Sequence, residues 1–202
     1  GGLGKTPPRT GVVLRNPDAA VLLADTKYGD PVSFEVVAPD GTSVVLVSFD
    51  AAWGILPGSG GGIQSRDVRV PESAFVVVAD APAGRGENLG AAFFADAVFG
   101  SAGKFGMYGT PTDVKVKRAK GEWPGALPPT LTAYEASFTT LTPGMRESER
   151  RVYIVASGPI GGGIFMLVVG STANRFKGGV QEQLRNVAAS FRAVEAPKTK
   201  MK

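Results

Sequence analysis

The side chains that could do acid–base chemistry in this chain are mainly carboxylates, because its 202 residues include no histidine and no cysteine. This composition excludes disulfides, thiolate metal sites and cysteine nucleophiles, and it removes the usual general base and the commonest transition-metal ligand. A glycosidase-like pair of carboxylates would have to be held at a defined separation across a cleft. The sequence spacing indicates no such pair, and most of the candidates read as caps, turns or surface charges: Asp67, Asp80, Glu87, Asp96, Asp113 and Glu135. We therefore expect no catalysis, and we assign no catalytic or cofactor-binding residue.

Two stretches have some of the composition of a phosphate-binding loop. Residues 58–62 read Gly-Ser-Gly-Gly-Gly, but the Ile-Gln-Ser-Arg that follows lacks the Gly-Lys-Ser or Gly-Lys-Thr ending that opens a helix. Residues 4–6 read Gly-Lys-Thr, but no strand precedes them and Pro7 and Pro8 block a following helix. We interpret both stretches as plain loop or arm.

Metal binding is limited by the same composition to sites built from oxygen ligands. The sequence has no Asp-x-Asp-x-Asp-Gly loop, and Asp40-Gly41 is placed as a turn by its context. A calcium-binding module stays open as an alternative function.

The charge pattern does not indicate nucleic acid as a partner. The formal net charge is +4, but the lysines and arginines are scattered, and the aromatic residues do not alternate with them. The composition is 43% hydrophobic and 20% charged, which suits a packed domain with a soluble surface. Because no apolar run approaches the roughly 18 residues of a membrane span, we expect no transmembrane segment.

Periodicity predicts strands, a helix, more strands and a terminal helix. A hairpin is expected from residues 32–37 and 43–49, with the turn at 39–42, and further strands at 67–71, 73–80, 112–119, 131–139, 151–156 and 164–169. Apolar spacing predicts helices over 87–99 and 180–191, and one helical turn near residue 17. Because most strands are joined by short turns, the sheet should be mainly antiparallel. The expected fold is α+β, an α/β/α sandwich with a central sheet flanked by helices.

We divide the chain into an extended N-terminal arm (1–25), one domain (26–196) and a basic tail (197–202). The arm and the glycine-rich stretch at 58–62 are our candidates for contact with a partner, although ordinary disorder explains both equally well. The start of the chain shows no signal peptide, so we expect any targeting sequence to have been removed already.

The C-terminal third resembles the PsbP family, the extrinsic oxygen-evolving-enhancer proteins of photosystem II and their lumenal relatives. The resemblance rests on meander strands, then Arg175-Phe176-Lys177, then a helix that ends Ala188-Ala189-Ser190-Phe191. It covers residues 131–194 well, 68–116 fairly and the earlier residues poorly. The absence of histidine and the unusual first half favour a PsbP-like relative over the photosystem II subunit itself.

This resemblance implies a non-catalytic extrinsic protein that docks on, stabilises or helps assemble a photosynthetic membrane complex. It implies residence in the chloroplast thylakoid lumen, peripheral to the membrane, with the lumenal face of photosystem II or an associated complex as partner. Two alternatives stay open: a calcium-binding lumenal module, since the family has been linked with calcium, and an unrelated antiparallel α/β binding domain. Basic residues at a docking rim would make the attachment sensitive to salt.

Overall fold

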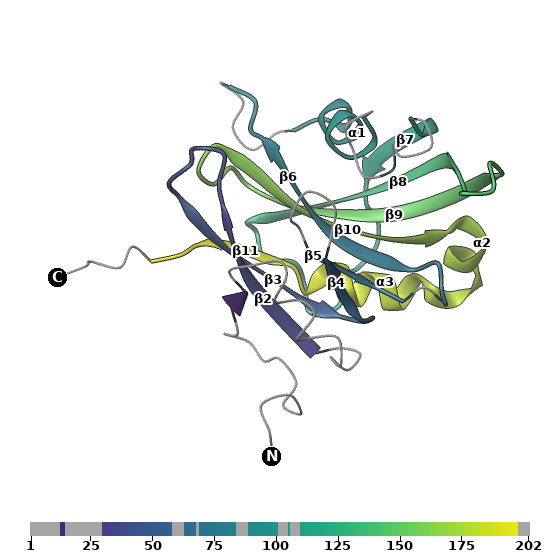
Figure 1. The fold of residues 1–202 in the computed structure, drawn as a ribbon, viewed down its shortest axis with the longest axis horizontal. Coiled ribbons are helices and arrows are strands. Elements are labelled where there is room, and N and C mark those ends of the chain that lie inside the picture. Colours follow the sequence, from purple (N-terminus) through teal and green to yellow (C-terminus); the bar gives the residue numbers. More distant parts are fainter. Residues whose placement is uncertain are drawn as a thin grey trace, which may run out of the picture.

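The computed structural model of the chain describes residues 13–14, 30–57, 63–67, 69–83, 89–100, 105 and 110–197, and their strands form two sheets (Figure 1). The four-stranded sheet has the order β1 (Val13–Leu14), β2 (Asp30–Val37), β3 (Val44–Ala51) and β11 (Arg192–Glu195). The seven-stranded sheet has the order β4 (Ile55–Pro57), β5 (Ile63–Arg66), β6 (Ser73–Asp80), β10 (Gly163–Thr172), β9 (Glu147–Ser157), β8 (Leu131–Leu141) and β7 (Thr112–Arg118). Only β1 and β2 pair in parallel among the described strands, so the predicted antiparallel character is confirmed.

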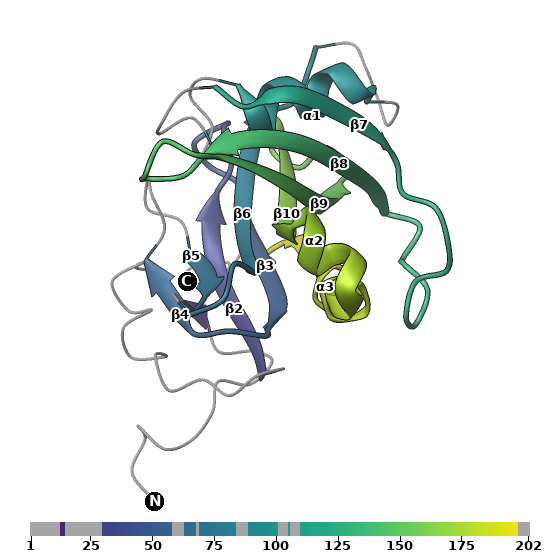
Figure 2. The ribbon, with the colours of Figure 1, turned by 90° about the vertical axis from the view of Figure 1, so that its right-hand side faces the viewer.

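Helices cover both faces of the seven-stranded sheet, as the predicted sandwich requires. The helix α1 (Ala91–Phe99) buries Phe94, Val98 and Phe99 against one face. On the other face lie a short helix α2 (Ala173–Arg175), a π-helical turn η5 (Phe176–Val180) and the helix α3 (Gln181–Ala189). Figure 2 shows α1 and α3 on opposite sides of the long strands. Among the described residues, no helix is long and apolar enough to cross a membrane.

The strand β10 joins the two halves of the core because it is buried on both faces. Phe165, Leu167 and Val169 point to the cluster under α3, whereas its even-numbered neighbours point to the cluster under α1. A continuous apolar run is what a strand between two covered faces requires. The apolar run at 163–169 therefore lies in the central strand of the seven-stranded sheet.

The four-stranded sheet is a feature that the sequence did not predict. The strand β3 alternates between buried and half-buried residues, and its inner side chains Val45, Val47 and Phe49 pack into the α3-side cluster. The strand β11, which follows α3 in the chain, pairs with β3 on the side opposite β2. The second sheet thus covers the part of the central sheet that α3 leaves open.

The turn predicted at Asp40 is confirmed. The Asp40 carboxylate accepts hydrogen bonds from the backbone N–H groups of Thr42 and Ser43 and from the Ser43 hydroxyl. These bonds, that of the Ser43 hydroxyl above all, lower the pKa of Asp40 to about 2. Both carboxylate oxygens thus accept hydrogen bonds within the turn, which is the usual role of Asp at such a position.

The strand predicted at 67–71 is wrong. Asp67 instead turns the chain, because its carboxylate accepts the Arg69 backbone N–H at 2.9 Å and its carbonyl accepts the Val70 N–H at 3.2 Å. An Asp side chain that bonds backbone two residues on competes with strand pairing in this way. The helix expected over 87–99 begins at Ala91, after the non-helical Leu89 and Gly90. Residues 87–88, the helical turn expected near residue 17 and the glycine-rich residues 58–62 lie outside the described residues.

Candidate docking surface

The segment α2–η5–α3 crosses the concave side of the seven-stranded sheet and has a hollow on each side. We call this surface the helical face. One hollow, the charged groove, lies between α2–η5 and strands β7 to β9. The other, the tryptophan groove, lies between α3 and the loop after β7.

An ion pair between the exposed Arg175 and the buried Glu72 fixes the start of this segment. Arg175 donates to both carboxylate oxygens of Glu72, at 2.8 Å from Nε and 2.6 Å from Nη2, and the Ser171 hydroxyl donates to the same carboxylate at 2.6 Å. The Glu72 side chain is 2% exposed and that of Arg175 is 47% exposed. Burial raises the pKa of Glu72, but the hydrogen bonds from Arg175 and Ser171 and the charges of Arg175 and Arg150 outweigh it and lower the pKa overall. The Arg175 of the family-like motif is thus an anchor between α2 and the residue before β6.

The other two residues of that motif have different roles. Phe176 is buried beside the Tyr153 ring. The Arg151 guanidinium lies 4.4 Å from the centroid of the Phe176 ring. Lys177 is exposed and lines the charged groove. The motif therefore places one cation, Arg175, in an ion pair with the buried Glu72 and the other, Lys177, on the surface.

The charged groove has a volume of about 430 Å³ and carries more cations than anions. Its charged lining comprises Lys115, Arg150, Arg151, Lys177, Asp113 and Glu149, and its floor includes the hydroxyls of Ser137 and Thr139. Lys115 and Lys177 are exposed, and neither forms an ion pair with another described residue. These two ammonium groups are available to a partner.

The remaining cations of the groove are held by the protein itself. Glu135 lies between Lys117 and Arg151, with each nitrogen 3.3 Å from the same carboxylate oxygen. Arg150 donates from Nη2 to the Pro71 carbonyl at 2.9 Å, while its buried Nε has no partner among the described residues. Burial and the nearby Arg66 charge lower the pKa of Arg150, against the opposing effect of Glu72. Arg150 and Arg151 therefore shape the groove more than they offer it free charge.

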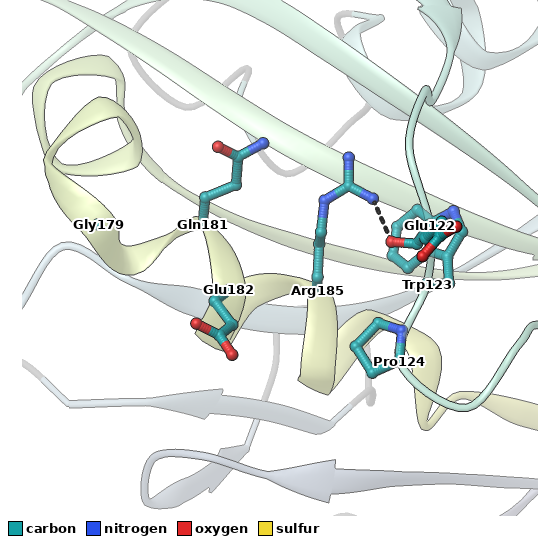
Figure 3. A pocket seen from close by; sticks show the side chains of 7 residues that line it. All are labelled: Glu122, Trp123, Pro124, Gly179, Gln181, Glu182 and Arg185. Atoms are coloured by element: carbon teal, nitrogen blue, oxygen red, sulfur yellow. Dashed lines mark hydrogen bonds between the residues drawn. The ribbon is translucent and has the colours of Figure 1, made fainter.

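The tryptophan groove is an open hollow of about 570 Å³ beside the half-buried Trp123 (Figure 3). Its lining comprises Glu122, Trp123, Pro124, Gly179, Gln181, Glu182 and Arg185. Arg185 clamps the loop to α3, because its Nη1 donates to the Glu122 carbonyl at 3.2 Å and its Nη2 donates to the Lys120 carbonyl. The same guanidinium lies 4.7 Å from the Trp123 ring centroid and 4.9 Å from that of Tyr153. The Arg185 guanidinium thus holds the Trp123 ring in place.

The structure disperses the carboxylates that the sequence offered as candidates. Asp67 binds Arg69 at 2.7 Å, Asp80 ends β6, and Asp96 is an exposed residue of α1. Asp113 lines the charged groove, and Glu135 pairs with Arg151 of its lining. Glu87 lies outside the described residues. Of the candidates that the structure describes, Asp113 alone lines either of the two grooves.

Metal ligands are likewise dispersed over the described part of the chain. No group of three or more acidic side chains gathers there in a position to hold an ion.

Sequence reasoning missed both grooves. Lysines 115 and 117 alternate with valines 114 and 116, and this pattern correctly predicted a strand with one solvent-exposed face. It could not show that α2–η5 would stand opposite that face. The Trp-Pro-Gly sequence at 123–125 places a Trp in a connection between strands, but it could not show that α3 would lie beside that loop.

Comparison with known proteins gives a likeness in fold only. No family model matches the chain, and no curated protein matches it. The solution structure of cyanobacterial PsbP (CyanoP) from Synechocystis sp. PCC 6803 is similar, with 14% identity, a TM-score of 0.46, and coverage of 82% of this chain and 94% of that one. The crystal structure of LpqN, involved in cell envelope biogenesis of Mycobacterium tuberculosis, matches with 13% identity, a TM-score of 0.40, and coverage of 83% and 92%.

Proposed function

We propose that the protein is a non-catalytic docking protein that attaches to an acidic surface of a protein partner through the charged groove. The observation that carries this proposal is the pair of exposed ammonium groups, Lys115 and Lys177, on opposite walls of one groove. Charged groups around a docking site steer and orient the partner, and they make attachment dependent on salt.

The sequence resemblance to the PsbP family supplies the kind of partner in this proposal. The partner would be a photosynthetic membrane complex, photosystem II or one associated with it, and the protein would sit peripherally on its lumenal face in the thylakoid. The role is that of a structural subunit or an assembly factor, with no metal required for attachment.

The test is reattachment of the purified chain to salt-washed thylakoid membranes, followed by native-gel separation of the complexes. We expect the chain to migrate with one complex and to be released by concentrated salt without detergent. The charge reversals K115E and K177E should each weaken attachment several-fold, because each replaces an attraction by a repulsion.

The matched control is R146E, which makes the same change in net charge at an exposed residue of the β8–β9 turn, outside the groove lining. This variant should attach like the wild type at every salt concentration. Retention of the chain until detergent is added, or equal losses in all three variants, would overturn the proposal. Calorimetric titration with calcium should give a flat trace, and a saturable heat would favour the calcium-binding alternative.

A further inference from the structure

The tryptophan groove offers hydrogen-bond acceptors and an aromatic surface, and its one cation is already engaged. All three guanidinium nitrogens of Arg185 donate to protein acceptors: Nε to the Tyr153 hydroxyl at 3.0 Å, and the other two to loop carbonyls. Gln181 uses its amide nitrogen on the same hydroxyl at 2.7 Å, so its amide oxygen is left as an acceptor. Because these donors are bonded within the protein, the groove presents hydrogen-bond acceptors and an aromatic ring to a ligand.

Two carboxylates at the rim set the sign of the remaining charge. Glu122 on the loop and Glu182 on α3 are both exposed, and neither forms an ion pair with another described residue. Figure 3 shows Glu182 and Gln181 on the helix side and Trp123 with Pro124 on the loop side. A long cationic side chain is the complement of such a site, because its stem packs on apolar rings while its head reaches a carboxylate.

The groove is preformed. The Arg185 clamp fixes the ring of Trp123, which lies edge-on to the Tyr153 ring at 5.3 Å. Gly179, at the end of the groove, has a φ of 112° and open space where a side chain would lie, so the backbone there stays uncovered. A rigid, partly exposed Trp in a groove is the residue type most often responsible for binding energy at protein interfaces.

We propose that this groove binds a lysine or arginine side chain of a protein partner. The cationic head group lies at the carboxylates of Glu122 and Glu182, and the aliphatic stem lies against Trp123 and Pro124. The site is opposite in sign to the charged groove on the far side of η5. A partner surface with an acidic patch next to a basic residue would therefore fit the helical face in a single orientation.

The chain carries its own probe for this site. It has two tryptophans, and Trp53 is 3% exposed in the core, so a surface ligand changes the fluorescence of Trp123. The experiment titrates the full chain with acetylated tetralysine amide and, separately, with tetraglutamate amide. We expect a saturable change with tetralysine, none with tetraglutamate, and none in the W123F variant.

Carboxylate variants place the binding within the groove. E122Q and E182Q should each weaken tetralysine binding by about twofold to fivefold, the range for exposed ion pairs. The control E195Q removes an exposed carboxylate on β11, outside the groove lining, and should leave the affinity unchanged. Equal affinity in all variants, or equal binding of tetraglutamate, would overturn the proposal. Self-association that E122Q and E182Q abolish would also overturn it, because the occupant would then be a second copy of the chain.

Discussion

Replacing Arg175 by methionine removes the charged partner of the buried Glu72 while preserving most of the side-chain volume. Breaking a buried pair on one side costs about 3–5 kcal/mol, because the other charge is left uncompensated. Arg175 is 47% exposed, so water already screens part of the attraction. We therefore expect R175M to lower the free energy of unfolding by about 2–3 kcal/mol at pH 7, or the melting temperature by roughly 4–12 °C for a domain of this size.

The pH dependence of R175M gives the sharper test. In the wild type the pKa of Glu72 is lowered, so its contribution to stability is present above the unfolded value and is lost as the pH falls through the folded value. In R175M burial is still opposed by the Ser171 hydrogen bond and the Arg150 charge but no longer by Arg175, so the pKa of Glu72 is higher than in the wild type and the variant loses less stability as the pH falls. Urea unfolding of both proteins, followed by tryptophan fluorescence between pH 7 and pH 4, should show the deficit shrinking. A deficit that stays constant over this range, or one below about 0.5 kcal/mol at pH 7, would refute the reasoning.

Three further predictions concern single positions. G170A should lower the free energy of unfolding by about 1–3 kcal/mol in urea, because the added Cβ would lie 2.7 Å from the Arg151 carbonyl oxygen, whereas G178A has open space and should cost less than half as much. Y153F should cost about 1–2 kcal/mol in the same assay, because Gln181 and Arg185 both donate to this buried hydroxyl, and an unchanged midpoint would contradict the clamp. D40N should flatten the acid-unfolding curve between about pH 4 and pH 2, where the lowered pKa of Asp40 makes the wild type lose stability, and parallel curves would show that the turn is not the cause.

The sequence predicted those elements whose patterns are local. The run at 163–169 became the doubly buried β10, and the spacing of Leu184, Val187 and Ala188 gave the buried side of α3. Asp40 with Gly41 gave the hairpin turn, because Asp bonds its own backbone and Gly adopts a φ of 79°. In each case the information lies within a few residues.

Features that depend on distant partners could not be predicted in this way. The pairing of β11 with β3 joins residues from 144 (Arg192 and Ser48) to 150 (Glu195 and Val45) positions apart, and the ion pair of Glu72 with Arg175 spans 103 positions. Residues 67–71 have strand-like composition, but the Asp67 carboxylate turned them. The grooves of the helical face arise only when α2–η5–α3 lies across strands and a loop from other parts of the chain, so no local pattern reveals them.

The central claim is that the charged groove is the surface in contact with the partner, and site-specific photo-crosslinking tests it most directly. A benzophenone side chain would replace Thr139, which lines the groove, or Val37, which is 60% exposed on the four-stranded sheet. On salt-washed thylakoid membranes, the account predicts a crosslink from position 139 to a subunit of one membrane complex, lost in concentrated salt, and none from position 37. Crosslinks from position 37 alone, or from both positions equally, would contradict it.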